Sequence, residues 1–216
     1  MNPQFTDQDN ASLDAVIMAR RSERVFQPRG VSSADIDAVI KSGLYAPYGG
    51  LANGTADDFR RFFVFSQSGG QLPKLHTIIR DNAAAGALIL QRQSAHDPAR
   101  AEKAMPFIKR MQSLAENGIP GFETAPCCII IAERKGVPPV EKQALAHVIE
   151  NMWQKATALN LGLRLVSAIG GLAENEDFCK LLDLNPGEFA VEGCLIGYPA
   201  GETANRLRPQ KIVTRL

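Results

Sequence analysis

Apolar residues recur at helical spacing in several stretches of the chain, and capping residues mark where the helices begin. A first helix is expected over residues 11–20, with Asp9 or Asn10 as its cap. The pair Ser32 and Asp35 resembles a capping box and predicts the start of a second helix, which has an apolar face. Apolar residues lie on one face of the first helix (Leu13, Val16 and Ile17) and recur at helical spacing in the second (Ile36, Val39, Ile40 and Leu44).

The same pattern predicts three further helical regions. Residues 73–118 have a helical, Ala-rich pattern with a break at residues 95–98, where His, Asp and Pro cluster. A long helix starts near Pro139, carries a broad apolar face and is closed by Gly162. A short helix is expected over residues 174–183.

Four segments are predicted to be strands because they are rich in aromatic, β-branched or other apolar residues. They span residues 61–66, 127–132, 164–166 and 189–198. The second strand, CCIIIA, is apolar throughout, which is typical of a strand buried on both faces. Helices and strands alternate without a regular βαβ rhythm and no linker divides the chain. Residues 1–216 are therefore predicted to form a single α+β domain.

The charge balance and the apolar pattern exclude some partners. Twenty-four Lys and Arg oppose 23 Asp and Glu, so the net charge of +1 gives no basic field that would drive nucleic-acid binding. The N-terminal sequence MNPQFTDQDN is polar and acidic, unlike a secretory signal, and no apolar run approaches the ~20 residues that span a bilayer. A cytoplasmic protein with no nucleic-acid or membrane partner is expected.

The cysteines and histidines do not form a metal-binding pattern. The cysteine spacing matches neither CxxC pairs nor a disulfide framework, and the histidines form no HExxH-like pair. Cys127 and Cys128 lie in the apolar strand and are expected to be buried structural thiols. No metal site is predicted.

One short segment carries candidate binding chemistry. Arg20, Arg21, Ser22 and Arg24 stand together at the end of the first predicted helix. Guanidinium forks bind phosphate in a bidentate manner and a serine hydroxyl adds a donor, so the segment suits a phosphate group. The alternative is a solvated helix end whose positive charge complements the helix dipole.

Five stretches, taken in order, resemble the FMN-dependent nitroreductase family. They are MARRSERVF, LYAPYGG, APCCIIIAE, NMWQKATALNLGLRLVSAIGG and LLDLNPGEFAVEGCLIGYP. In the family, an Arg-x-Ser-x-Arg/Lys segment is followed by a helix and Ala-Pro-Ser, and later by a helix ending in Ala-x-x-Leu-Gly-Leu. The resemblance covers most of the chain except residues 69–118. It implies a mostly antiparallel central sheet flanked by helices, in an intertwined homodimer with two FMN sites at the interface.

The resemblance also assigns residues of this chain to FMN. Arg20, Arg21 and Ser22 would meet the phosphate and the ribityl chain. Arg24 would lie near the N1 and O2 edge of the ring, where a positive charge stabilises the reduced flavin. No metal and no catalytic side chain are implied, because the flavin itself performs the redox chemistry.

Two segments would enclose the flavin ring, and a late arginine would complete the phosphate site. The other subunit would cover the ring with three residues, Pro47, Tyr48 and Gly49. A turn of small residues, which lets the flavin approach closely, would line the opposite face near N5 with Ala168, Ile169, Gly170 and Gly171. The late arginine would be Arg206 or Arg208. Each assignment has a structural alternative: a helix end, an ordinary turn and tail charges, respectively.

The sequence departs from the family pattern at three points. Tyr48 stands where the family usually has Ser, so it could stack on the flavin or narrow the substrate slot. The sequence LANGTADDF replaces the family's Asn-x-Gln-Pro-Trp and leaves Asn53 as the remaining candidate contact. Gly170 stands where an acidic residue often precedes the Gly of the turn, which is expected to change the hydrogen bonding near N5.

The activity implied by the resemblance is a ping-pong oxidoreductase. NADH or NADPH delivers hydride to N5 and leaves before a nitroaromatic, quinone, enone or free flavin takes the electrons from the same face. One alternative is a dehalogenating or flavin-fragmenting enzyme on the same fold, with residues 69–118 as a lid. The others are a flavin-binding module without turnover and a plain interaction protein, which would be colourless.

Overall fold

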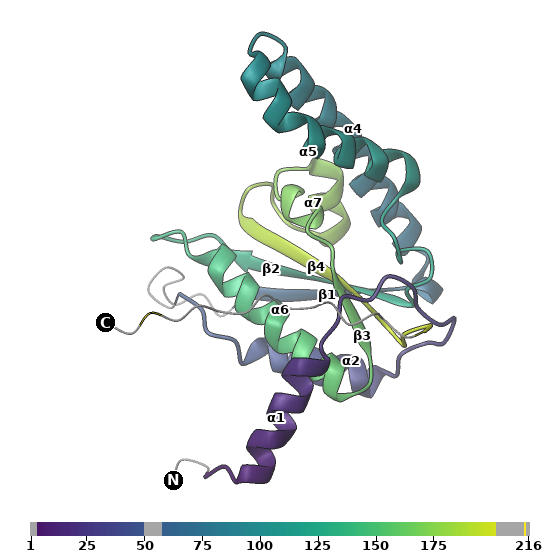
Figure 1. Ribbon diagram of the computed structural model, residues 1–216, viewed down its shortest axis with the longest axis vertical. Coiled ribbons are helices and arrows are strands. Elements are labelled where there is room, and N and C mark those ends of the chain that lie inside the picture. The colour runs from purple at the N-terminus through teal and green to yellow at the C-terminus, as the bar shows by residue number, and fades with distance from the viewer. Residues whose placement is uncertain (1–3, 50–57, 202–213, 215–216) are drawn as a thin grey trace.

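A computed structural model describes residues 4–49, 58–201 and 214 of the chain, and a four-stranded antiparallel sheet lies at the centre of this part (Figure 1). The strand order is β1-β2-β4-β3. The strands are β1 (Arg60–Ser66), β2 (Cys127–Arg134), β3 (Gly162–Leu165) and β4 (Phe189–Gly197). The helices are α1 (Asp7–Ala19), α2 (Ser33–Leu44), α4 (Leu72–Ser94), α5 (Pro98–Asn117), α6 (Glu141–Ala158) and α7 (Glu176–Leu182). The predicted α+β architecture is confirmed.

Strand β2 separates two hydrophobic cores, as its uninterrupted apolar sequence predicts. Alternate residues of a strand point to opposite faces of the sheet. Cys127 and Ile129 therefore pack into the core beneath α2 and α6, whereas Cys128 and Ile130 pack into the core beneath α4 and α7. All four side chains are buried. The sheet is covered by helices on both faces.

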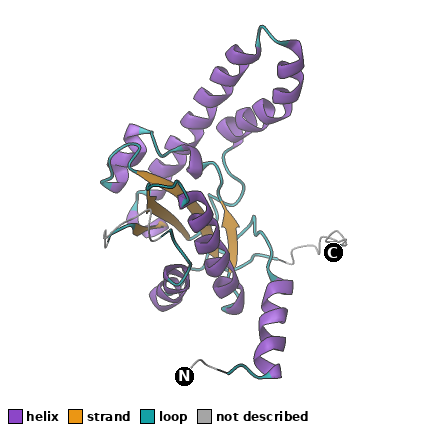
Figure 2. Cartoon of the chain, turned by 90° about the vertical axis from the view of Figure 1, so that its left-hand side faces the viewer, coloured by secondary structure: helices purple, strands orange, loops and turns teal. Residues whose placement is uncertain are grey.

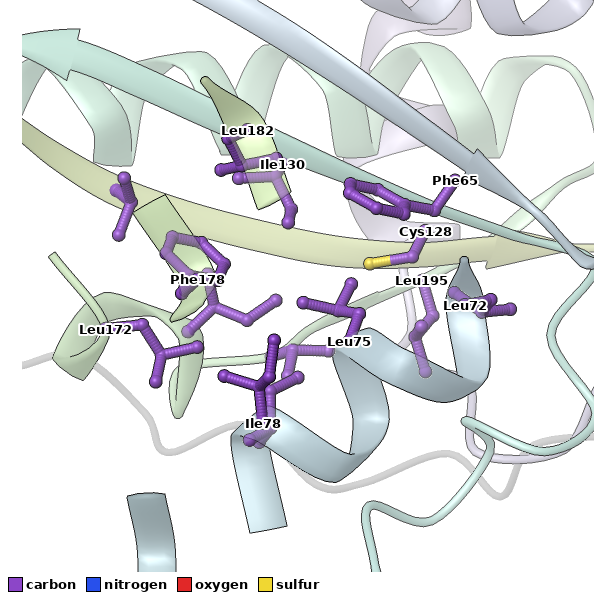
Figure 3. Packing of buried hydrophobic residues seen from close by; sticks show 14 of the residues in the cluster. Phe65, Leu72, Leu75, Ile78, Cys128, Ile130, Leu172, Phe178, Leu182 and Leu195 are labelled. Atoms are coloured by element: carbon purple, nitrogen blue, oxygen red, sulfur yellow. The ribbon is translucent and has the colours of Figure 1, made fainter. Parts of the chain in front are cut away.

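The first core joins the beginning of α4 and the segment around α7 to the sheet (Figure 3). Leu75 of α4 and Phe178 of α7 are fully buried and lie among side chains of three strands, β1, β2 and β4. Phe65, Cys128 and Leu195 supply those strand contacts. Burial of each large apolar side chain contributes about 1.5–3 kcal/mol to the free energy of unfolding, so this core fixes the base of α4 against the sheet.

The second core brings α2 close to α6. Val39 of α2 is fully buried with Leu145 of α6. A Cβ atom added to Gly43 would lie 3.0 Å from side-chain atoms of both Val148 and Met152, so a larger residue at this position would force those side chains to shift. The close packing sets the position of the segment that follows α2.

Helices α4 and α5 form a hairpin that extends beyond the sheet, and α1 extends from the opposite end of the molecule (Figures 1 and 2). The helical pattern and the break predicted for residues 73–118 are confirmed, since α4 ends at Ser94 and α5 begins at Pro98. The two helices pack closely where Gly86 faces Met111. The hairpin is thus an arm whose base lies on the first core.

Two predicted helix boundaries are wrong. Helix α1 begins at Asp7 because Thr6, not Asp9 or Asn10, is its cap: the Thr6 side chain accepts from the backbone N–H of Asp9, and the Asp9 carboxylate accepts in return. Helix α6 is not closed by Gly162, because Asn160 adopts the left-handed conformation with φ of 57°. Asn tolerates that conformation through local hydrogen bonding, which leaves Gly162 free to begin β3.

The four cysteines are free and buried, as predicted for the two in β2. Burial raises the pKa of the Cys127 thiol to about 12, so this thiol is protonated and unreactive at neutral pH. Among the helices in the described part of the chain, none has the length and apolar character needed to cross a membrane.

Candidate functional site

The arginine-rich segment lies beside β3, far from it in sequence. The backbone N–H of Glu23 donates to the carbonyl of Leu163 at 3.2 Å, and Ser22 forms a parallel bridge with the same residue. The indole N–H of Trp153 donates to the carbonyl of Arg21 at 2.9 Å and fixes the segment from the other side. These contacts bring the predicted phosphate-binding residues to the strand that leads into the glycine turn.

The three arginines of the segment have different surroundings. Arg20 forms an ion pair with Glu150 at 3.2 Å, and its guanidinium lies 4.7 Å from the centre of the Trp153 ring. Arg21 donates to its neighbour's carbonyl, that of Arg20, at 2.9 Å and also to the carbonyl of Met18. Arg21 therefore has the helix-end contacts of the alternative interpretation, whereas Arg24 is exposed.

The turn predicted to face the flavin is a short 3-10 helix, η2 (Ile169–Gly171), directly after β3. Ile169 is fully buried, so only its backbone is available to a ligand. A Cβ atom on Gly171 would meet nothing closer than the amide nitrogen of Asn82, at 3.8 Å. Ala168 and Gly171 line the neighbouring cavity, so this side of the turn is open to a close approach.

A cavity of about 320 Å³ lies between the base of the α4–α5 hairpin, β3 and the turn. This volume is typical of small-molecule sites. Its walls are mainly apolar, with a few polar groups among them. The lining residues that carry polar side chains are Asn82, Arg110, Arg164 and Ser167.

The cavity has a positive edge. Burial, and then the nearby charges of Arg24 and Arg110, lower the pKa of the Arg164 guanidinium. Arg164 also donates to the carbonyl of Pro120. Because Arg24 belongs to the N-terminal segment and Arg110 to α5, the tertiary structure alone brings these charges together.

Asn82 is a cavity-lining residue that was not predicted from the sequence. A signal was present, since Leu75, Ile79, Asn82 and Ala83 share one face of α4. An amide side chain on the buried face of a helix needs a hydrogen-bonding partner, and a bound ligand is one group that can serve as that partner. Asn82 lines the cavity opposite the glycine turn.

Glu192 is a second residue that sequence reasoning missed. It interrupts the apolar strand β4, and its Oε1 lies where a Gly170 side chain would be, 2.7 Å from an added Cβ atom. Its Oε2 atom is buried without a hydrogen-bonding partner among the described residues. Burial raises the pKa of Glu192 to about 7, although the N–H of Gly193 and the charge of Lys142 oppose this. A carboxyl group therefore does approach the turn, from β4.

The raised pKa of Glu192 predicts a pH-dependent effect of Glu192→Gln. In the unfolded chain the Glu192 carboxyl ionises near its ordinary pKa of 4.5, whereas in the folded chain its pKa is about 7. The free energy of unfolding of the wild type therefore falls as the pH rises between these two values. The neutral variant avoids this loss, and after allowance for solvent screening it should gain on the order of 1–2 kcal/mol at pH 8 relative to pH 5. Urea unfolding at both pH values measures the gain, and exposed Glu102→Gln is the control. Equal gains at both pH values would contradict the ionisation argument.

The predicted ring-covering residues lie elsewhere in the chain. Pro47, Tyr48 and Gly49 follow α2, and none of them lines the cavity formed by the described residues of the same chain. The guanidinium of Arg60 donates to the carbonyls of Ala46 at 3.0 Å and Pro47 at 3.3 Å, which fixes the start of this segment.

Three predicted FMN contacts, Asn53, Arg206 and Arg208, lie outside the described residues.

Comparisons with known proteins agree with the resemblance. The sequence matches the nitroreductase family over residues 17–198. The fold is similar to a nitroreductase with bound FMN from Bacteroides fragilis, with a TM-score of 0.68 and 20% identity over 94% of this chain and 98% of that chain. A nitroreductase with bound FMN from Desulfitobacterium hafniense gives a TM-score of 0.63 and 18% identity over 95% of this chain and 98% of that chain.

A BluB-like flavoprotein from Clostridium difficile has a comparable fold, with a TM-score of 0.66 and 18% identity over 94% of this chain and 99% of that chain. A comparison with curated proteins gives no match.

Proposed function

Since the chain belongs to the nitroreductase family, whose pattern it matches over residues 17–198, we propose that it is an FMN-dependent oxidoreductase that takes electrons from NADH or NADPH. The acceptor would be a small molecule such as a nitroaromatic or a quinone. The observation that carries the proposal is the cavity that is lined by the glycine turn, Asn82, Arg110 and Arg164. It combines an open backbone surface, apolar walls and a positive edge.

The cavity and the arginine-rich segment beside β3 together fit FMN. Arg20, Arg21 and Ser22, which do not line the cavity, would hold the phosphate and ribityl chain. Arg24, whose charge acts on Arg164, would lie at the N1 and O2 edge of the ring. The open turn with Gly171 would allow the flat ring to approach the backbone. When bound, FMN would supply the transfer of two electrons from the nicotinamide to the acceptor.

The protein would contribute position, charge and exclusion of water. Arg24 would place positive charge where negative charge develops on reduction, which stabilises the reduced state. Apolar residues such as Phe107 and Met111 form walls that keep water from the reacting atoms. The backbone of the turn, held by the hydrogen bond from the N–H of Gly171 to the carbonyl of Ala168 at 3.3 Å, would orient the ring.

The Tyr48 side chain does not obstruct the cavity of its own chain. Its ring stacks on Phe59, with centroids 4.2 Å apart and planes at 30°, and Tyr48 does not line the cavity. A Tyr48 side chain contributed by a second copy would cover the flavin ring instead, so nicotinamide oxidation decides between turnover and flavin storage.

Two exposed apolar surfaces support a homodimer. Helix α1 buries none of its residues, although Leu13 and Met18 are apolar, and a helix of this length is marginal in isolation. Leu88 and Ile89 on α4 are also exposed. We propose that a second copy of the chain covers these surfaces and contributes Pro47, Tyr48 and Gly49 to the flavin site.

Purified protein is expected to contain FMN and to oxidise NADH or NADPH. The absorbance spectrum in the flavin region, followed by heat release and mass identification, should give about one FMN per chain. Steady nicotinamide oxidation with a nitroaromatic or quinone acceptor then measures turnover.

Each result of this experiment separates the proposal from its alternatives. Bound FMN without nicotinamide oxidation would indicate a flavin-binding module or a divergent flavin enzyme, such as a dehalogenating or flavin-fragmenting one. A colourless protein that fails to take up added FMN would contradict flavin binding altogether.

A further inference from the structure

Two guanidinium groups in the cavity are not used by the proposed FMN contacts. Arg110 of α5 and Arg164 of β3 both line the cavity, although they come from distant parts of the sequence. Among the described residues, neither forms an ion pair with a carboxylate, and Arg164 has only the carbonyl of Pro120 as a recorded acceptor. Both groups therefore retain donors for a ligand.

These positive charges repel one another. Arg164 lies close enough to Arg24 and Arg110 for their charges, together with burial, to disfavour its protonated state. Like charges gathered at a partly buried site cost free energy unless an anion neutralises them. An anionic ligand in the cavity would remove this cost and accept hydrogen bonds from the unused donors.

The remaining walls of the cavity suit an aromatic body. The side chains of Phe107 and Met111 come from α5, and those of Ile79 and Ala83 come from α4. An aromatic ring can stack on Phe107, and the sulfur of Met111 makes favourable contacts with aromatic rings. At about 320 Å³, the cavity has the size of a small-molecule site rather than a macromolecular one.

We propose that the preferred electron acceptor is a small aromatic carboxylate, whose negative group is bound by Arg110 and Arg164. This inference rests on the proposed function and specifies its substrate class. Planar guanidinium forks match a carboxylate in geometry and charge, and such charge-assisted bonds are stronger than neutral ones. Arg24 remains with the flavin edge, so Arg110 of α5 and Arg164 of β3 select the acceptor.

For a nitroaromatic acid the reaction balances as follows. The nitro group takes two electrons and two protons and becomes a nitroso group, with the loss of one oxygen as water. NADH or NADPH supplies two electrons and one proton and becomes NAD⁺ or NADP⁺, and the second proton comes from solvent. The carboxylate is not changed, so the arginines bind it equally before and after the reaction.

The test compares two matched acceptors, 4-nitrobenzoate and 4-nitrobenzamide, with the FMN-loaded enzyme under anaerobic conditions. The wild type should show the higher kcat/KM with 4-nitrobenzoate. The double variant Arg110→Gln and Arg164→Gln should lose about tenfold in kcat/KM for this acid and remain within about twofold for the amide. The single variant Arg110→Gln should show a smaller loss in the same direction, and it keeps the Arg164 bond to Pro120.

Lys109→Gln is the matched control, because it removes one positive charge from the adjacent position of the same helix, and Lys109 does not line the cavity. This variant should keep the wild-type ratio between the two acceptors. An equal loss for both acceptors, an unchanged ratio in the Arg110 variant or a loss of bound FMN would overturn the assignment of the arginines to the acceptor.

Reduction of neither acceptor by the wild type would instead reject the proposed function and this inference together.

Discussion

Glu133→Ala is expected to lower the free energy of unfolding by about 3–5 kcal/mol, because it leaves a buried guanidinium without its counter-ion. Arg60 and Glu133 are paired across β1 and β2, with Nε 2.7 Å from Oε2, and their side chains are only 2% and 1% exposed. The Nη2 atom adds a bond to Oε1 at 3.2 Å. Urea unfolding of the variant and the wild type at neutral pH measures the difference.

Glu174→Ala provides the control for this prediction. Glu174 forms an ion pair with Lys135 at 3.1 Å, but its side chain is 72% exposed. Water and salt screen such a pair, so its loss should change the urea midpoint little. If Glu133→Ala were as mild as Glu174→Ala, the buried pair would have no special role in stability.

A double variant, Arg60→Met with Glu133→Leu, tests what else Arg60 does. Replacing both members of a buried pair by apolar residues often restores stability. Here only part of the loss should be recovered, because Arg60 also donates to the carbonyls of Gly43 at 3.1 Å and Ala46 at 3.0 Å. The Ala46 oxygen would lose this donor, whereas the Gly43 oxygen would still accept from the backbone N–H of Ala46 at 3.1 Å. Full recovery would show that these carbonyls find other partners.

Gly162→Ala is expected to raise the dissociation constant for FMN by about tenfold or more, since overpacking typically costs about 1–3 kcal/mol. The added Cβ atom would lie 2.9 Å from the Cβ of Glu23 and 3.3 Å from the Cγ of Pro199. Glu23 is buried, so its segment would have to move away from β3. This movement would break the bond to Leu163 and displace Ser22 and its neighbouring arginines. Quenching of FMN fluorescence on titration with apoprotein measures the dissociation constant.

Gly30→Ala is the matched control for Gly162→Ala. It introduces the same methyl group in the N-terminal part of the chain, where nothing lies within 4 Å of the new Cβ atom. FMN affinity should therefore equal that of the wild type. If Gly162→Ala also left FMN affinity unchanged while remaining folded, the segment beside β3 would not form the phosphate site.

The secondary structure was largely predictable because its signals are local. The apolar spacing of α2 and its Ser32 cap, and the continuous apolar run of β2, predict elements that the structure confirms. The boundary errors arose where two signals competed. Thr6 forms a capping box upstream of the expected cap of α1. Asn160, which precedes Gly162 in the chain, adopts the left-handed conformation that was expected of Gly162.

The candidate site was predictable only in part. The family resemblance predicts that the arginine-rich segment and the glycine turn bind FMN, and in the structure both lie next to β3. The resemblance does not point to Asn82, because α4 lies in the region that it leaves out. It does not point to Glu192 either, because a single Glu in an apolar strand does not by itself indicate a binding site. Their roles depend on what faces them across the fold, Gly171 and Gly170 respectively.

By itself, the sequence determined the helices and strands, the α+β class and the family, because periodicity, caps and motif order act over short stretches of chain. Only the tertiary structure decided which charges meet. Arg24, Arg110 and Arg164 belong to three separate segments, and the folding of the α4–α5 hairpin over β3 gathers the last two around one cavity. Electrostatic interactions and cavity walls depend on distance in space, which the order of residues along a chain does not specify.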